Sequence, residues 1–123
     1  MIPLPKTKKG YRKPRFRVML GKEIALGPGK VDLLETIRET GSISSAARQL
    51  GLSYRRAWEM VDVMNRCFAG PLVGCAVGGR GGGGAVLTER GRLVIAAYRA
   101  MERKAVKAST AEWETIRKEL KRG

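Results

Sequence analysis

Two adjacent arginines, Arg55 and Arg56, are the residues whose type and position suggest the clearest chemistry. They follow Ser53 and Tyr54, and an apolar stripe of helical spacing begins directly after them. All four residues therefore belong to the first turn of a predicted helix. A helix N-terminus carries partial positive charge, so paired cations are unfavourable there unless an anion binds beside them. The pattern indicates recognition of an anion such as a nucleic-acid phosphate.

The remaining reactive residues argue against catalysis and against a metal centre. Cys67 and Cys75 are the only cysteines, and the chain has no histidine. A structural zinc site normally takes four Cys or His ligands, and histidine is the most common general base. We therefore expect no enzyme activity, no cofactor and no metal, with two reduced cysteines.

A second unusual stretch, VGGRGGGGAVLT at 77–88, holds six glycines around Arg80. A phosphate-binding Walker loop would need Gly-Lys-Ser/Thr opening a helix, and these glycines lead into apolar residues instead. A disordered RGG tract would repeat the motif, which here occurs once. The flanking residues Leu72-Val73 and 85–87 predict two antiparallel strands joined by a glycine-rich tip. Such a tip would present Gly79, Arg80 and Gly81 to a partner.

A helix-turn-helix is the element that must position the arginine pair. The sequence predicts a short helix over 44–50 capped by Ser42 or Ser44, a turn at Gly51, and a second helix over 53–67. We expect Ile43, Ala46, Ala47 and Leu50 to form the buried side of the first helix. The expected apolar stripe of the second helix is Ala57, Trp58, Val61, Met64 and Phe68.

The flanking segments complete the predicted organisation. Residues 1–14 read as a basic flexible arm, and the alternation in 15–26 suits a strand up to Leu20. A helix is expected over 27–41. A long helix over 88–108, capped by Thr88, is interpreted as a dimer helix, with packing onto its own core as the alternative. The segment 109–120 opens with a capping-box pattern at Ser109 and Glu112 and should form a last helix.

The overall composition fits one basic domain. The chain has 123 residues and a formal net charge of +14, with a mean hydropathy of -0.25. A charge of this size favours a polyanionic partner. No apolar run approaches the roughly 20 residues of a membrane span, and no export signal is recognised. We therefore expect a cytoplasmic, nucleoid-associated protein with no membrane partner.

Two segments together closely resemble the N-terminal DNA-binding domain of the ModE family of molybdate-dependent transcriptional regulators. They are GSISSAARQLGLSYRRAWEMVDVMN and GGRGGGGAVLTERG. The helix-turn-helix half is similar, less specifically, to that of LysR-type regulators. The resemblance covers roughly 15–108 and implies a mainly α fold with a small β-hairpin. That fold is a winged helix-turn-helix with a long C-terminal dimerisation helix, followed by a helical extension over 109–123. It also implies a homodimer on double-stranded DNA, with a palindromic operator. The DNA-binding residues are then expected to be Ser44, Ser53, Tyr54, Arg55, Arg56, Gly79, Arg80 and Gly81.

Two departures from the family accompany this resemblance. Family members carry C-terminal molybdate-binding modules, whereas this sequence ends at Gly123, so we expect no molybdate binding through that site. Gly74 and Cys75 also stand where the family hairpin usually has charged residues. Besides a sequence-specific regulator, two alternatives stay open at this point. One is a sequence-neutral architectural DNA-binding protein, and the other is an oxyanion or metal sensor that uses Cys67 and Cys75 at a dimer interface.

Overall fold

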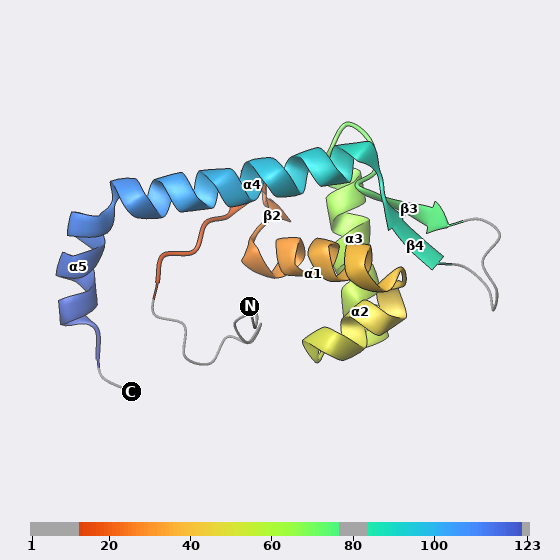
Figure 1. The fold of residues 1–123 in the computed structure, drawn as a ribbon, viewed down its shortest axis with the longest axis horizontal. Coiled ribbons are helices and arrows are strands. Elements are labelled where there is room, and N and C mark those ends of the chain that lie inside the picture. Colours follow the sequence, from red (N-terminus) through yellow and green to blue (C-terminus); the bar gives the residue numbers. More distant parts are fainter. Residues whose placement is uncertain (1–12, 77–83, 122–123) are drawn as a thin grey trace.

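A computed structural model describes residues 13–76 and 84–121. The described chain forms a winged helix-turn-helix with a long C-terminal helix, as the sequence predicts (Figure 1). In order, the elements are β1 (Val18–Leu20), β2 (Glu23–Leu26), α1 (Pro28–Thr40), α2 (Ile43–Leu50), α3 (Tyr54–Cys67), β3 (Val73–Ala76), β4 (Gly84–Leu87), α4 (Glu89–Ala108) and α5 (Thr110–Glu119).

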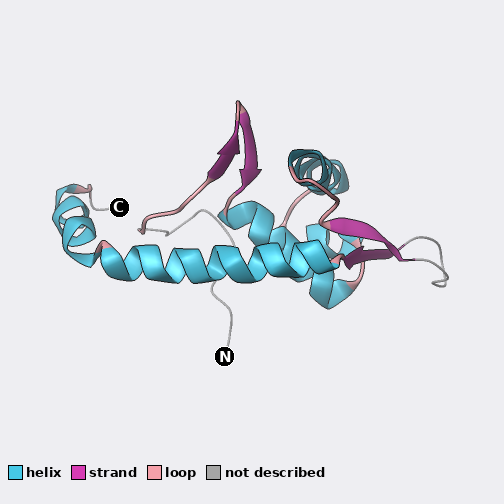
Figure 2. Ribbon diagram, turned by 90° about the horizontal axis from the view of Figure 1, so that it is seen from above, coloured by secondary structure: helices cyan, strands magenta, loops and turns pink. Residues whose placement is uncertain are grey.

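The strand predicted up to Leu20 is present as β1. The strand β2, which the sequence analysis did not predict, pairs antiparallel with β1 around a turn at Gly21. Gly21 has φ +59°, a left-handed conformation that glycine adopts without steric cost. The tip of this hairpin projects away from the helices in Figure 2, and Val18, Met19 and Leu20 are exposed, whereas Ala25 and Leu26 of β2 are buried. The sequence analysis therefore found the first strand and missed the turn and the strand that follows it.

Helices α1 to α3 form the compact centre, and glycines end the first two. Gly41 and Gly51 follow α1 and α2 with φ +78° and +70°, and their N–H groups donate to carbonyls of the preceding turns. Ser42 caps α2, because its side chain accepts a hydrogen bond from the Ser45 N–H at 2.9 Å. Of the two caps that the sequence allowed, Ser42 is therefore correct and Ser44 is not the cap.

A single hydrophobic core joins these helices to the strands and to α4. Leu33, Leu34, Ile37, Met64 and Leu72 are fully buried in it. The small pair Ala46 and Ala47 is also buried, which allows α2 to cross its neighbours closely. Other members are Leu26, Val31, Ala57, Val61, Val73, Ala85, Leu87, Ile95 and Tyr98.

The wing hairpin pairs β3 with β4 antiparallel, with Val73 opposite Leu87 and Ala76 opposite Gly84. The Asn65 side chain fastens β3 to α3: its amide donates to the Val73 carbonyl, and its oxygen accepts from the Leu72 and Val73 N–H groups. The Ala85 N–H donates to the Gly41 carbonyl at 2.9 Å. These bonds fix the base of the wing to the helix-turn-helix. The predicted tip residues Gly79, Arg80 and Gly81 lie outside the described residues.

Helix α4 has two different long faces. Its N-terminus is capped as predicted, because the Thr88 hydroxyl oxygen accepts from the Gly91 N–H at 3.0 Å. Ile95 and Tyr98 are buried against the core, whereas Leu93 and Met101 are 63% and 44% exposed. The apolar residues of α4 are therefore divided between a packed face and an uncovered face. The rest of α4 extends past the core as a rod (Figures 1 and 2).

A partly buried ion-pair cluster holds α4 against α1. The Arg99 guanidinium donates to Asp32 at 2.8 Å, to Glu35 at 2.7 Å and to Glu102 at 3.1 Å. These bonds, above all those to Glu35, raise the pKa of Arg99 above its already high ordinary value. Arg99 is therefore charged at every pH at which the fold is studied.

The capping box expected at the beginning of α5 is absent. Ser109 precedes α5 but caps no N–H with its side chain; its hydroxyl instead donates back to the Ala105 carbonyl at 2.6 Å. The chain bends sharply between α4 and α5 (Figure 1). The large apolar residues of this C-terminal segment pack poorly, since Ile116 and Leu120 are exposed and Trp113 is only half-buried.

Candidate nucleic-acid interface

The first turn of α3 is an uncovered, positively charged surface. The Ser53 side chain caps the helix by accepting from the Arg56 N–H at 3.0 Å. Tyr54 is exposed, and the Arg55 side chain is 90% exposed. The first turn of α3 contains no acidic residue. The helix dipole and the two arginines therefore add to the same positive potential, as the sequence predicts.

The charged side chains along α3 are arranged in helical pairs. Arg55 donates to Glu59 at 3.2 Å, and Arg66 donates to Asp62 at 3.0 Å. Both pairs are solvent-exposed, so each contributes little to stability. Arg55 can consequently exchange Glu59 for an anionic partner at small cost.

Trp58 is not part of the apolar stripe that the sequence analysis assigned to α3. Its side chain is 48% exposed, while Ala57, Val61 and Met64 are buried. Residues 57, 61 and 64 lie on one face of a helix, and the partly buried Met60 broadens that face. Trp58 is four residues after Tyr54, so the two rings lie on the same exposed side of α3. Trp58, which the sequence analysis expected in the apolar stripe of α3, therefore lies outside its buried face.

Ser44 lies at the N-terminus of α2, the second helix end expected at the interface. It is exposed in the first turn, two residues after the Ser42 cap. Uncapped N–H groups of a first helical turn and a nearby hydroxyl are suitable donors for a phosphate oxygen. Ser44, Ser53, Tyr54, Arg55 and Arg56 thus occupy exposed positions at the two N-termini of the helix-turn-helix.

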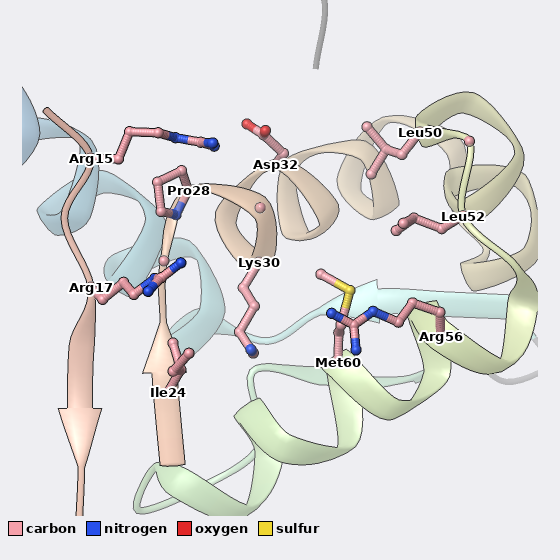
Figure 3. A pocket seen from close by; sticks show the side chains of 13 residues that line it. Arg15, Arg17, Ile24, Pro28, Lys30, Asp32, Leu50, Leu52, Arg56 and Met60 are labelled. Carbon is pink, nitrogen blue, oxygen red and sulfur yellow. The ribbon is translucent and has the colours of Figure 1, made fainter. Parts of the chain in front are cut away.

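Sequence reasoning missed a basic cavity beside α3. A hollow of about 490 Å³ lies between β2, the N-terminus of α1 and the α2–α3 turn. Figure 3 shows Arg15 and Arg17 extending into it from one side, Arg56 from the other, and Lys30 between them. Burial lowers the pKa of Lys30, and the positive charge of Arg56 lowers it further. The one sequence feature that could have indicated this cavity is GPGK, the beginning of α1, which contains no acidic residue.

The two cysteines do not form a disulfide. Cys67 ends α3 and is half-buried, while Cys75 is exposed in β3. Across residues 13–76 and 84–121, no group of three His, Cys, Asp or Glu side chains is placed to hold a metal ion. In that same part of the chain no helix is long and apolar enough to cross a membrane.

The helix-turn-helix and the wing also decide the family. Residues 29–92, which run from α1 into α4, match the family described as bacterial regulatory helix-turn-helix protein, lysR family. The chain belongs to this family. The members of this family are DNA-binding transcriptional regulators and not enzymes.

Individual relatives of this lysR-family chain agree with the ModE resemblance. It is 54% identical over 77 residues to the molybdenum-pterin-binding protein MopB of Rhodobacter capsulatus, covering 63% of this chain and 28% of MopB. It is 47% identical over 78 residues to the molybdenum transport protein ModE of Azotobacter vinelandii, covering 63% and 29%. It is 42% identical over 79 residues to the DNA-binding transcriptional dual regulator ModE of Escherichia coli K12, covering 64% and 30%. The chain thus matches less than a third of the length of these relatives.

Proposed function

We propose that this chain is the DNA-binding part of a transcriptional regulator that acts as a homodimer in the cytoplasm on a palindromic operator. The uncovered first turn of α3 is the observation that carries the proposal. Arg55 and Tyr54 are exposed there beside the helix dipole, and nothing in the described part of the chain covers them. A recognition helix presents its N-terminal residues to base edges in the major groove.

The wing and the second helix N-terminus supply backbone contacts in this proposal. Ser44 binds a DNA phosphate at the beginning of α2. Ser53 caps α3 with its hydroxyl oxygen and donates its hydroxyl hydrogen to the DNA backbone. Arg80, between Gly79 and Gly81, reaches an adjacent phosphate or the minor groove. The family membership supports this arrangement, and the net charge of +14 supplies sequence-independent attraction.

We propose residues 15–108 as the winged helix-turn-helix unit with its dimer helix, and 109–123 as a helical extension. In support of the first limit, the Phe16 carbonyl, just before β1, accepts a hydrogen bond from the Tyr98 hydroxyl of α4 at 2.6 Å. Residues 1–14 act as a basic arm that adds affinity for DNA.

Selection from a library of random duplexes tests the proposal at 150 mM salt. We expect enrichment of a palindromic sequence with two half-sites. For that sequence, Arg55→Ala and Arg56→Ala should each weaken binding by about 1–3 kcal/mol, as loss of a bidentate guanine contact does. Arg117→Ala, at the far end of the molecule in α5, is the matched control and should change binding little.

The second candidate function is a sequence-neutral architectural protein, which the high net charge favours. In that case the selection would yield no consensus, and the Arg55 and Arg56 variants would weaken all duplexes equally. That result would replace the proposal by its alternative.

A further inference from the structure

The basic cavity beside α3 has a composition that DNA binding does not explain. One part of its lining is cationic, with Arg15, Arg17, Lys30 and Arg56 drawn from the N-terminal segment, α1 and α3. The other part is apolar, formed by Ile24, Pro28, Leu50, Leu52 and Met60. The cavity therefore combines concentrated positive charge with a hydrophobic wall.

Three of the four cations of the cavity have no acidic partner among the described residues. Across residues 13–76 and 84–121, no carboxylate lies within ion-pair distance of Arg17, Lys30 or Arg56. Asp32 is the one acidic residue in the lining, and its Oδ1 accepts from the Arg99 guanidinium at 2.8 Å. Arg99 shares its one charge among Asp32, Glu35 and Glu102. Burial lowers the pKa of Lys30 most, and the positive charge of Arg56 lowers it further.

The backbone at the cavity adds donors of the same sign. Helix α1 begins at Pro28 with Gly27 as N-cap, and no side chain caps its first N–H groups. No acidic residue lies in that first turn. Unsatisfied N–H groups of a first turn favour an oxyanion, and here three charged side chains converge on the same space.

We propose that this cavity binds a small organic anion, a phosphate monoester or carboxylate attached to an apolar body. The anionic group lies among Lys30, Arg17 and Arg56, and the apolar body lies against Leu50, Leu52 and Met60. A phosphodiester within a duplex fits this site poorly, because its two sugars keep it from entering a concave hollow. A volume of about 490 Å³ lies within the usual range for small-molecule sites.

The site is placed to couple ligand binding to DNA binding. Arg56 lines the cavity and also belongs to the first turn of α3. A bound anion would hold Arg56 in the cavity and away from a base or phosphate. This coupling rests on the proposed function, whereas ligand binding itself does not depend on DNA.

Calorimetric titration of the full chain at 150 mM salt, without DNA, tests the site. Phenyl phosphate and benzoate are the probes, and inorganic phosphate is the reference anion without an apolar body. We expect saturable binding of phenyl phosphate at one site per chain, at least tenfold tighter than inorganic phosphate. Lys30→Gln should weaken it at least tenfold, and Leu52→Ser should remove the preference for phenyl phosphate over inorganic phosphate.

Arg38→Gln is the control, because Arg38 is exposed on α1 outside the cavity and its loss lowers the net charge equally. Its affinity for phenyl phosphate should stay within twofold of the parent. Thermal unfolding of each variant distinguishes loss of the site from loss of the fold, and Arg17→Gln repeats the test if Lys30→Gln unfolds. Absence of saturable binding by both organic probes would overturn the proposal. So would equal weakening by Arg38→Gln and Lys30→Gln, since that result means attraction to net charge alone.

A second titration distinguishes the small anion from DNA as the source of the phosphate. Phenyl phosphate is added to the chain in the presence of a short duplex. Weaker DNA binding at saturating phenyl phosphate supports the coupling through Arg56. If Lys30→Gln weakens DNA binding while the free chain takes no phenyl phosphate, the cavity is a DNA phosphate site and the proposal is wrong.

Discussion

At the scale of single residues, Arg55 and Arg56 are neighbours in the sequence but have different surroundings. Arg55 points into solvent and pairs with Glu59, whereas Arg56 lines the basic cavity beside Lys30. The sequence places the two arginines next to each other and predicts one role for both. Their separation by about 100° around α3 gives them different surroundings, which adjacent letters do not reveal.

Gly91 is the residue at which the fold tolerates a side chain least. It lies in the first turn of α4, and a Cβ there would collide with the Leu72 carbonyl oxygen. That carbonyl also accepts the Thr88 N–H at 2.9 Å, so it cannot move without loss of the bond. Gly91→Ala should therefore lower the free energy of unfolding by roughly 1–3 kcal/mol despite the better helix propensity of alanine.

Urea denaturation of Gly91→Ala and of Gly29→Ala measures this effect. Gly29 lies in the first turn of α1, and a Cβ there meets nothing within 4 Å. The control should be neutral or slightly stabilised. Equal stability of the two variants would show that the Leu72 carbonyl moves away from α4 with no loss in the free energy of unfolding.

Tyr98 connects α4 to the segment before β1. Its hydroxyl donates to the Phe16 carbonyl, and burial raises the pKa of Tyr98 above its ordinary value of 10.0. Tyr98→Phe should cost about 0.5–1.5 kcal/mol at pH 7, the usual value of one hydrogen bond. Because the folded-state pKa is raised, the contribution of Tyr98 is complete below pH 10 and is lost as the pH rises through the folded value.

Stability curves of the parent and of Tyr98→Phe from pH 8 to 11 measure this linkage as a difference. The difference should shrink at the alkaline end, since only the parent loses the tyrosine contribution there. Lys30, whose pKa is lowered, titrates in both proteins and cancels in the difference. A difference that is constant across the range would contradict the linkage.

Local signals determined most elements, and tertiary contacts determined the rest. Glycine after α1 and α2, serine before α2 and α3, and threonine before α4 were each readable from the sequence, because they satisfy the helix ends themselves. The exposure of Trp58 and the back-bonding of Ser109 were not readable. Trp58 is exposed because residues 57, 60, 61 and 64 already fill the space beneath α3. Ser109 bonds to the Ala105 carbonyl of the preceding helix, a partner that competes with the cap of α5.

The cavity illustrates the same limit at the site. Its cations come from residues 15, 17, 30 and 56, which no motif connects. The N-terminal arginines lie opposite α3 because the chain turns back at Gly21 to form the hairpin of β1 and β2, and the sequence analysis predicted only the first of these strands. The helix α3 was predictable because its residues are contiguous in the sequence. The cavity was not predictable because its residues come from separate segments that only the fold brings together.

The wing is the element whose contribution to DNA binding is most separable. Its base is fixed by Asn65 and by the Ala85 to Gly41 hydrogen bond, so changes at the tip leave the core intact. Arg80 lies outside the described residues, and we predict that Arg80→Ala weakens specific and random duplexes by similar factors. The slope of log K against log salt should decrease by about one unit, because one fewer counterion is released.

Fluorescence titration of both duplexes at several salt concentrations gives these slopes. Arg117→Ala, which removes one positive charge from α5, serves as the control and should leave the slope unchanged. An unchanged slope for Arg80→Ala would exclude a phosphate contact by the wing tip. Loss of specific binding alone would indicate that Arg80 reads bases.

At the scale of the whole molecule, α4 is longer than the core it covers. At 1.5 Å per residue its 20 residues span about 30 Å, and its far end carries α5 beyond the core. Leu93, Ala97 and Met101, each four residues apart, form an exposed stripe beside the buried Ile95 and Tyr98. Exposed apolar residues at this spacing are typical of a helix that packs against a second helix.

The last prediction concerns that uncovered face. If two chains pair through α4, Leu93→Glu should convert the dimer into a monomer, because a carboxylate would be buried without a partner at the interface. The fold of each chain should be retained, since Leu93 is 63% exposed in the single chain. Binding to a palindromic duplex should weaken by at least tenfold, whereas binding to one isolated half-site should change little. The reason is that two linked domains can bind simultaneously only to a duplex with two half-sites. Sedimentation of the parent, of Leu93→Glu and of Val86→Glu measures the oligomeric state, with Val86 as an exposed apolar residue that lies in β4 and not in α4. A dimer that persists in Leu93→Glu, or that dissociates equally in Val86→Glu, would assign the contact between chains to another surface.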